Sequence, residues 1–314
     1  MYAIIKRHSM TKYLFTLSLL FSQCSSGQTF ADYAKLGFNA QQNKNYQEAI
    51  TQYSKAQKIE PHNMDINRRI ALMYYYLPKY DSALFYYNLV LTDNPNDSIS
   101  YYQRGFVYLD SGEYQKSVND FTAAFNFSKT SADACFNIGK SYSGLGNFDK
   151  AIEFYKKTLT LLPNDKVSFY EIGYSYASGS VPNKDSALKY YNKAIEQDKN
   201  YYDPYFNRGL LYANQFKDLK RAHQDLEESI VIRPKNQLSY LYNGLLYFGK
   251  KEYGKAKDMY DNVIAQYPDY GQAYYERARA WYGIGILNMV CKDLDKAEAL
   301  GFTQAIEAKK QLCK

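Results

Sequence analysis

The chain has 314 residues, a formal net charge of +7 and an aromatic content of 17%, with 36 tyrosines. Its first 24 residues contain three basic side chains and no acidic one, so the remainder holds 36 basic against 32 acidic residues, a charge of +4. So small and scattered a charge argues against a nucleic-acid-binding surface, and we expect no nucleic-acid partner. Tyrosine combines an apolar ring with a polar tip, so this composition favours many half-buried contacts over one dry core.

The N-terminus carries a short apolar stretch, Tyr13–Phe21, which follows Lys12 and precedes small and polar residues. Nine residues are too few to cross about 30 Å of hydrocarbon as a helix. A basic residue, a short apolar stretch and then small residues are typical of a secretory signal. We therefore predict that residues 1–27 are an export segment, with either Met1 or Met10 as the true start.

Two cleavage positions are open in this segment. The tetrapeptide FSQC resembles a bacterial lipoprotein signal, which would make Cys24 the lipidated first residue, although Gln23 stands where a small residue is usual. Alternatively, Ser25 and Gly27 suit an ordinary signal peptidase that leaves Gln28 first. Both predict a protein of the bacterial cell envelope, soluble in the periplasm or held at the outer membrane by a lipid anchor, its only membrane contact. A cytosolic adaptor that retains its N-terminus is a third alternative.

A repeat with a period of 34 residues organises the rest of the chain. Five prolines are spaced by 34, 68, 71 and 34 residues, and the interval of 71 is two periods with three extra residues. We place two of these in the loop Ala177–Asp185 and one in Ala213–Arg221. A fixed period of this length indicates a tandem array of one small structural unit. The prolines are Pro61, Pro95, Pro163, Pro234 and Pro268.

Small and aromatic residues recur at fixed positions of the period. Apolar residues spaced by three and four form one face of a helix, and each period contains two such stretches separated by turn residues. Each unit is therefore expected to be an antiparallel helical hairpin, which buries its apolar faces only when neighbours stack on it. The small column is Gly37, Ala71, Gly105, Gly139, Gly173, Gly209, Gly244 and Ala278, and the aromatic column of the second stretch is Tyr53, Tyr87, Phe121, Tyr155, Tyr191 and Tyr260.

This pattern resembles the tetratricopeptide repeat family, most clearly in the stretch Asn137–Asp165. The resemblance covers residues 30–300, which would form eight units. It implies an all-α fold, a right-handed α-solenoid (superhelix) of about eight helix hairpins whose first helices line a concave groove. Residues 301–314 are more polar than the repeats, as a helix that caps the array with one solvated face should be.

Residues that carry chemistry are scarce. His62 and His223 have no histidine or cysteine at ligand spacing, so we expect no metal site and two ordinary surface histidines. The sequence also lacks a glycine-rich phosphate loop and a recognisable catalytic constellation. We therefore expect no cofactor and no enzymatic activity.

One face of the predicted first helices carries mainly aromatic and apolar residues, which we call the aromatic ladder. It predicts a groove that binds protein or peptide partners in an extended conformation; stacking on sugars, in a glycan- or peptidoglycan-binding module, is the alternative function. Packing between adjacent helices would explain the same residues. The ladder consists of Tyr102, Phe106, Phe136, Tyr170, Tyr174, Phe206, Leu241, Tyr275 and Arg279.

Two charged patterns bear on what such a groove would bind. The carboxylate clamp found in some members of the family does not assemble, because Phe136, Glu171 and Phe206 stand where basic side chains would be needed. Three arginines that precede the small column, Arg104, Arg208 and Arg277, are expected to pair with acids of the neighbouring unit.

The end of the chain contains two cysteines at matching positions. If the last two helices form a hairpin that turns near Phe302, Cys291 lies eleven residues before the turn and Cys313 eleven after it. Residues at equal height on antiparallel helices come within disulfide range, and export permits oxidation. We predict a Cys291–Cys313 disulfide that clasps the terminus, and a free Cys135 in a core column.

Overall fold

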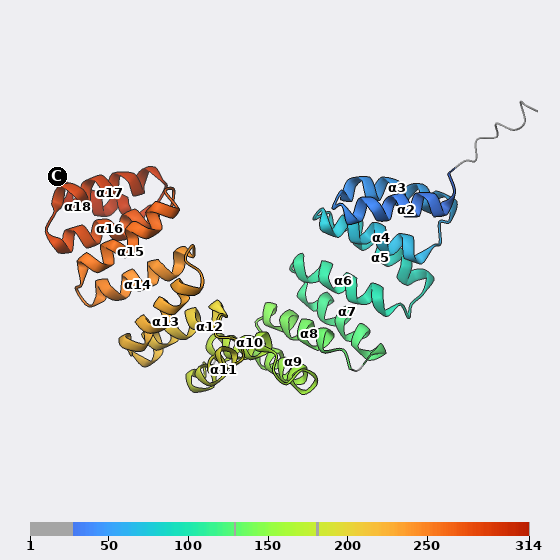
Figure 1. The fold of residues 1–314 in the computed structure, drawn as a ribbon, viewed down its shortest axis with the longest axis horizontal. Helices are drawn as coiled ribbons and strands as arrows, with labels where there is room; N and C mark the ends of the chain where they lie inside the picture. The colour runs from blue at the N-terminus through green and yellow to red at the C-terminus, as the bar shows by residue number, and fades with distance from the viewer. Residues whose placement is uncertain (1–27, 129, 180–181, 314) are drawn as a thin grey trace, which may run out of the picture. The chain divides into compact units, whose positions relative to one another are not determined.

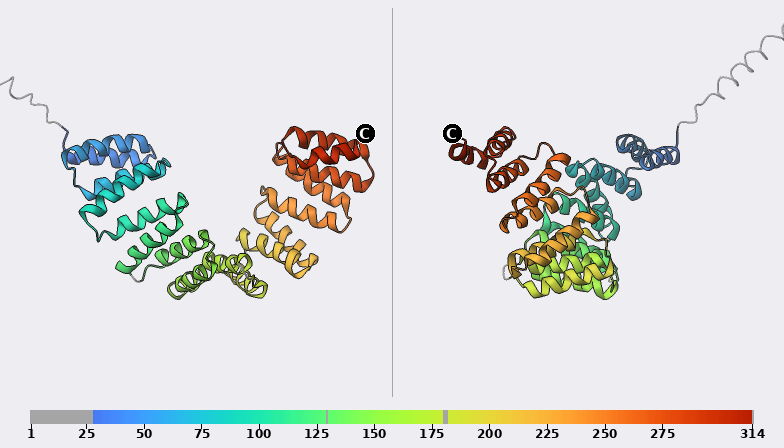
Figure 2. Two further views of the ribbon diagram at one scale, coloured as in Figure 1. Left: turned by 180° about the vertical axis from the view of Figure 1, so that it is seen from behind. Right: turned by 60° about the vertical axis from the view of Figure 1, so that its left-hand side comes forward.

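The computed structural model of the protein describes residues 28–128, 130–179 and 182–313, and the regular structure within these ranges is helical. The chain divides into two compact units, the first ending at Ser128 and the second formed by the residues that follow. Figure 1 shows successive antiparallel helix pairs in both units, and the views in Figure 2 show the same pairing. The predicted export segment, including Cys24, lies outside the described residues.

Eight consecutive helix pairs and a final helix account for the described residues. Within each unit the two helices of a pair pack together, and the second helix of one pair contacts the first helix of the next. The expected all-α fold of stacked helix hairpins is confirmed. The first unit contains α2 (Phe30–Gln42), α3 (Tyr46–Ile59), α4 (Met64–Tyr76), α5 (Tyr80–Asp93), α6 (Ser98–Asp110) and α7 (Tyr114–Phe127). The second contains α8 (Ala132–Gly144), α9 (Phe148–Leu161), α10 (Lys166–Ser178), α11 (Lys184–Gln197), α12 (Tyr202–Leu211), η1 (Tyr212–Phe216), α13 (Leu219–Ile232), α14 (Gln237–Gly249), α15 (Tyr253–Gln266), α16 (Gly271–Ile284), α17 (Leu287–Ala299) and α18 (Gln304–Leu312).

Short polar side chains begin many of these helices. The Asn147 side chain accepts a hydrogen bond from a backbone N–H of α9, and Asp165 does the same for α10. Such caps satisfy N–H groups that have no partner inside the helix. Just before Asn147, Gly146 has a φ of +72°, which glycine adopts without a steric cost. The local sequence of the turn thus closes the hairpin of α8 and α9.

The small and aromatic columns meet where the two helices of a hairpin cross. A Cβ atom added to Gly139 would lie 2.8 Å from a ring carbon of Tyr155, closer than van der Waals contact allows. Tyr155 is fully buried, as are Tyr53, Tyr87 and Tyr260 at the same place in other repeats. The glycine therefore lets the helix backbone rest on the ring, which explains why the two columns recur together.

The single extra residue predicted in Ala213–Arg221 appears as a π-helical turn. After α12 the chain continues as η1, and Lys217 then adopts a left-handed conformation with a φ of 55°. A π-helical turn holds one more residue than an α-helical turn and so absorbs an insertion without breaking the helix. The next helix, α13, therefore keeps its place in the repeat.

The C-terminal hairpin is covalently closed. Cys291 on α17 and Cys313 after α18 form a disulfide, with their Cα atoms 5.6 Å apart. Ala305 of α18 is buried in one cluster with Leu294 of α17 and Tyr274 of α16. Cys135, in contrast, is a buried free thiol. The last helix thus covers the apolar side of the eighth hairpin and is held there at its end.

Candidate functional site

The ladder residues of the first unit pack on their own hairpin. Tyr102 and Phe106 of α6 have ring centroids 5.1 Å apart, and both rings meet Phe121 of α7, at 5.5 and 5.1 Å. These edge-to-face contacts are favourable arrangements for aromatic rings. Both residues are half-buried. Their first role is therefore to close the crossing of α6 and α7.

Several ladder residues of the second unit are packed in the same way. The Phe136 ring lies 5.3 Å from Tyr155, and the Phe206 ring lies 5.7 Å from Tyr242 on the next first helix. Leu241 is only 2% exposed and belongs to a core cluster with Ala256 and Tyr260. A side chain buried to this extent cannot touch a partner, so Leu241 is a core residue and not part of a groove.

Tyr170, in contrast, lies at the centre of a group of rings that range from the buried Tyr191 to the exposed Tyr174. Its centroid is 6.4 Å from Tyr174, 6.0 Å from Tyr191 and 5.6 Å from Tyr201 at the start of α12. The amide of Asn207 donates a hydrogen bond of 3.2 Å to the Tyr170 hydroxyl. Tyr174 is 38% exposed and is the most open aromatic of the ladder in this unit. The rings are thus held by α10, α11 and α12 while one remains accessible.

Glu171 is a largely buried carboxylate at this group of rings, and it is poorly neutralised, although Lys166 lies over the Tyr201 ring at 5.6 Å from its centroid. Burial raises the pKa of its carboxyl to about 7; Lys140 of α8 opposes the increase and Asp203 of α12 adds to it. Among the described residues its carboxylate has no hydrogen-bond or ion-pair partner. Burial, and second the Glu171 charge, also raises the pKa of Tyr155 and Tyr170. We call Glu171, Tyr170, Tyr174 and Tyr201 the Glu171 site.

The first helix of the eighth repeat has a glutamate at the equivalent position, and here an arginine of the same helix neutralises its charge. Glu276 of α16 accepts a bond of 2.6 Å from Nη1 of Arg279, three residues later. The Arg279 guanidinium lies 4.4 Å from the Phe248 ring centroid and 6.0 Å from that of Tyr275. Glu276 is buried, which raises its pKa against the opposing effect of Arg279. Arg279, the arginine of the aromatic ladder, therefore forms an ion pair within its own helix.

The three arginines that precede the small column are engaged within their own hairpins, which corrects the expected pairing with neighbouring acids. Nε and Nη2 of Arg208 donate to both oxygens of Asp225 at 2.8 and 2.7 Å, while Nη1 donates to Asn192 of the preceding hairpin at 2.6 Å. Because α12 and α13 face each other, a carboxylate on the second helix is nearer than any on the next repeat. Arg104 binds Asp120 and Asn88, and Arg277 binds Asp293 and Asp261, in the same way. Only Asp261 is an acid of a neighbouring unit.

The two histidines differ, and the expectation of a surface position was wrong for one of them. His223 of α13 is 7% exposed, its Nδ1 lies 2.5 Å from the Asn243 side-chain oxygen, and its ring is 4.3 Å from that of Tyr247. Burial lowers the pKa of His223. His62 is exposed, with Asp93 at 3.1 Å. Within the described ranges, His, Cys, Asp and Glu form no group of three or more placed to hold a metal ion.

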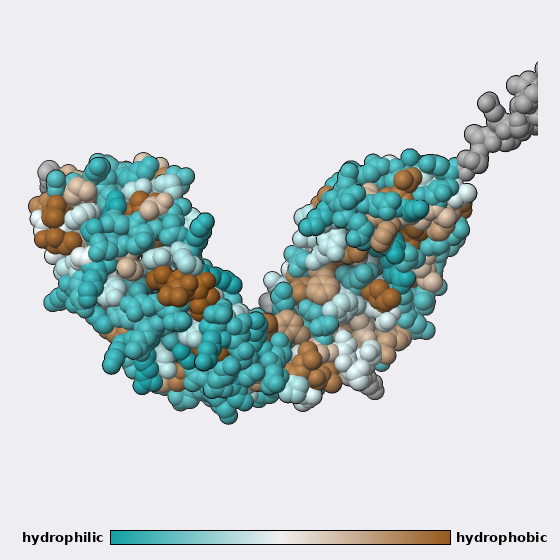
Figure 3. Space-filling model, viewed as in Figure 1, coloured by the Kyte–Doolittle hydropathy of each residue, from teal (hydrophilic) through white to brown (hydrophobic). Residues whose placement is uncertain are grey.

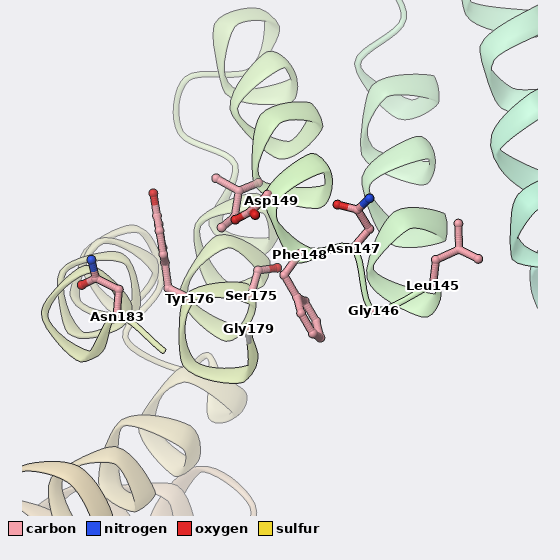
Figure 4. Close-up of a pocket in the computed structure, with 10 residues that line it drawn as sticks. Leu145, Gly146, Asn147, Phe148, Asp149, Ser175, Tyr176, Gly179 and Asn183 are labelled. Atoms are coloured by element: carbon pink, nitrogen blue, oxygen red, sulfur yellow. The ribbon is translucent and has the colours of Figure 1, made fainter. Parts of the chain in front are cut away.

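A separate hollow lies near these repeats. A cavity of about 500 Å³ sits between the α8–α9 turn and the C-terminal end of α10. Figure 4 shows Asn147, Phe148 and Asp149 on one side of it, and Tyr176 and Asn183 on the other. Among the described residues that line it, Asp149 alone is charged. A single carboxylate provides no acid–base pair, so we assign no chemistry to this hollow.

The distribution of apolar side chains on the surface limits where an apolar partner segment could bind. On the face seen in Figure 3, apolar side chains form separate patches among hydrophilic ones. A long continuous apolar groove is therefore absent from that face of the described residues. The Glu171 site combines aromatic rings with a carboxylate that has no ion-pair partner among the described residues.

Comparison with known proteins agrees with the architecture. Tandem helix hairpins with a small residue on one helix and a buried ring on the other define a helical-repeat protein. Tetratricopeptide repeat family models match residues 33–63, 99–130, 132–165 and 243–308, which together span just over half of the chain. The chain belongs to the tetratricopeptide repeat family. Proteins of this family generally bind protein or peptide partners.

Individual relatives are distant. A TPR repeat-containing protein of Methanocaldococcus jannaschii is 23% identical over 301 residues, covering 80% of this chain and 53% of that protein. Tetratricopeptide repeat protein 6 of Homo sapiens is 22% identical, covering 72% of this chain and 43% of its own length. The chain thus spans about half or less of these curated relatives. The solved C-terminal part of a TPR repeat-containing protein from Cytophaga hutchinsonii shares the fold, with 24% identity and a TM-score of 0.61 over 77% of this chain and 98% of that one.

Within the part of the chain that the structure describes, no helix combines the length and the apolar character needed to span a bilayer.

Proposed function

We propose that this protein is a non-enzymatic scaffold that binds an extended segment of a partner protein on the first helices of its second unit. The Glu171 site carries the proposal. It offers an accessible ring at Tyr174, rings fixed behind it, and a desolvated carboxylate that has no hydrogen-bond or ion-pair partner among the described residues. Because a buried charge without a partner is costly, such a site gains most from a ligand that supplies one.

The proposed setting is the bacterial cell envelope, on the strength of the apolar stretch and small residues in positions 13–27. The Cys291–Cys313 disulfide supports an oxidising compartment, since structural disulfides are rare where thiols are kept reduced. Mass spectrometry of the native N-terminus tests this setting. A lipidated Cys24 or a start at Gln28 is the expected result, and an intact start at Met1 or Met10 would contradict export.

Partner capture by the purified protein from the envelope fraction tests the binding face. Changing Tyr174 to Ser removes an accessible ring of the site, whereas Tyr282, which is 53% exposed at the end of α16, lies outside the ladder and provides the matched control. We expect Tyr174→Ser to reduce capture of specific partners at least fivefold and Tyr282→Ser to leave it unchanged. Equal recovery with both variants would exclude this face. Saturable binding of an isolated oligosaccharide, lost in Tyr174→Ser, would favour the glycan-binding alternative.

A further inference from the structure

The fifth and eighth repeats provide an internal comparison of one position in two electrostatic states. In the eighth repeat, Tyr275, Glu276 and Arg279 lie on α16, and the arginine neutralises the glutamate at 2.6 Å. In the fifth repeat the same positions on α10 hold Tyr170, Glu171 and Tyr174. The fifth repeat has the same aromatic ring and carboxylate as the eighth, but the uncharged Tyr174 stands where the eighth has the guanidinium of Arg279.

We propose that Glu171, with the rings of Tyr170 and Tyr174, binds an arginine side chain of the partner, whose guanidinium takes the place that Arg279 occupies in the eighth repeat. This inference rests on the proposed scaffold function and names the chemistry of its ligand. The partner segment is therefore basic at this position, the opposite of the acidic C-terminal peptides that a carboxylate clamp would recognise.

The surroundings of Glu171 favour a cation. Asp203 of α12 is the second carboxylate near it, and the hydroxyls of Tyr155, Tyr170, Tyr191 and Tyr201 all experience its charge. Lys140 is the one cation that acts on Glu171; it is exposed and forms no ion pair with it within the described residues. Lys140 thus makes the potential at Glu171 less negative but forms no bond with its carboxylate oxygens.

Arginine fits the site better than lysine does. A guanidinium is planar, donates two parallel hydrogen bonds to a carboxylate and stacks on aromatic faces. The chain itself shows this combination at Arg279, which lies over Phe248 and bonds to Glu276. In the fourth repeat the position of Phe248 is Ser143, so the aromatic faces available to an incoming guanidinium are those of Tyr170 and Tyr174.

A ligand-observed NMR titration of the full chain tests the proposal with two small probes. Nα-acetyl-L-arginine N-methylamide carries the guanidinium, and the corresponding citrulline derivative has nearly the same shape without the charge. We expect saturable binding of the arginine probe and at least tenfold weaker binding of the citrulline probe, since a hydrogen bond to a charged group discriminates by about that factor or more. Equal affinity for both probes would overturn the proposal.

Two substitutions locate the binding. Glu171→Gln keeps the shape of the side chain and should weaken arginine binding about tenfold, while Lys140→Ala should strengthen it severalfold by removing the competing charge. The matched control is Arg279→Ala, which vacates the internal site; we expect it to bind a second equivalent of the arginine probe and to regain thermal stability on adding it. An affinity unchanged by Glu171→Gln would also overturn the proposal.

The two proposals fail separately. Loss of partner capture in Tyr174→Ser, together with no arginine binding by the wild-type chain, would leave the scaffold function standing and exclude an arginine ligand. Arginine binding that depends on Glu171, together with undiminished capture by Tyr174→Ser, would support the arginine site and exclude this face as the partner groove.

Discussion

The fifth and eighth repeats differ in how they treat the same buried glutamate. In the eighth, Arg279 lies one helical turn from Glu276 and the charge is paired within the helix. In the fifth, Tyr174 takes that place and Glu171 has a pKa raised to about 7 because burial is only weakly opposed by Lys140. The two glutamates occupy equivalent positions of the repeat. The residue three positions later, Arg279 or Tyr174, therefore determines whether the glutamate has an ion-pair partner in its own helix.

Breaking the ion pairs of the eighth repeat should have the largest effect on stability. Asp293 is 2% exposed and binds the guanidinium of Arg277 through both oxygens. Removing one partner of a buried pair costs about 3–5 kcal/mol, and the lower end of this range applies here because Arg277 keeps its bond to Asp261. We expect Asp293→Ala to lower the free energy of unfolding by this amount in urea titrations. Asp295→Ala, which removes an exposed pair with Lys309, should cost less than about 1 kcal/mol. A similar cost for both would contradict the assignment.

Opening the disulfide should have the next largest effect. The bridge closes a loop with a sequence separation of 22 residues. Removing a cross-link over a loop of that size costs about 3 kcal/mol in the chain-entropy description. We expect the double variant Cys291→Ser/Cys313→Ser to lose about this amount in unfolding experiments and to expose the amides of α18 to hydrogen exchange. Undiminished protection of α18 would show that packing alone holds the terminus.

Changing the glutamate of the fifth repeat should have a smaller effect that depends on pH. A carboxyl whose pKa is raised on folding binds its proton more tightly in the native state, so stability falls as pH rises between its unfolded value, about 4.3, and its folded value, about 7. At pH 6 we expect Glu171→Gln to be more stable than wild type by about 2 kcal/mol, and near pH 4 we expect no difference. Urea titrations at several pH values measure this, and a difference independent of pH would contradict it.

The corresponding substitution in the eighth repeat sharpens the contrast. Glu276 also has its pKa raised by burial, but Arg279 bonds to it and opposes the increase. A raised pKa again favours the neutral form in the folded chain, so we expect Glu276→Gln to be stabilised at neutral pH, but by less than Glu171→Gln because it loses the bond from Arg279. Parallel urea titrations at pH 7.5 compare the two, and an equal gain in both variants would show that the two glutamates are in similar environments.

Much of the fold could be predicted from the sequence because the repeat is local. The spacing of Gly139 and Tyr155 follows from the helix crossing, and the extra residue near Lys217 was visible as a shift of the period. The Arg208–Asp225 pair lies within one hairpin and could have been found from the facing positions of its two helices. Burial was harder to foresee. The position of His223 near the start of a helix predicts exposure, but Asn243 and Tyr247 of the next hairpin cover its ring.

The candidate site was only half visible in the sequence. Tyr170 and Tyr174 were predicted from their place in the period, but Leu241, at the position equivalent to Tyr170, proved to be a core residue. Glu171 was noticed only as a residue unsuited to a carboxylate clamp. The charges of Lys140 on α8 and Asp203 on α12 act on Glu171, and among the described residues no cation bonds to it. These are properties of the packed helices, which the periodicity of the sequence does not describe.

Titration of the Glu171 carboxyl is the most direct test of an unpaired, largely buried glutamate that binds arginine. Carbon-13 NMR of the side-chain carboxyl, assigned with Glu171→Gln, measures its pKa in the full chain with and without the arginine probe. We expect a pKa near 7 in the free chain and a clear decrease when Nα-acetyl-L-arginine N-methylamide binds, because a guanidinium stabilises the charged form. A carboxyl that titrates near 4.3 in the free chain and does not respond to the probe would contradict this expectation.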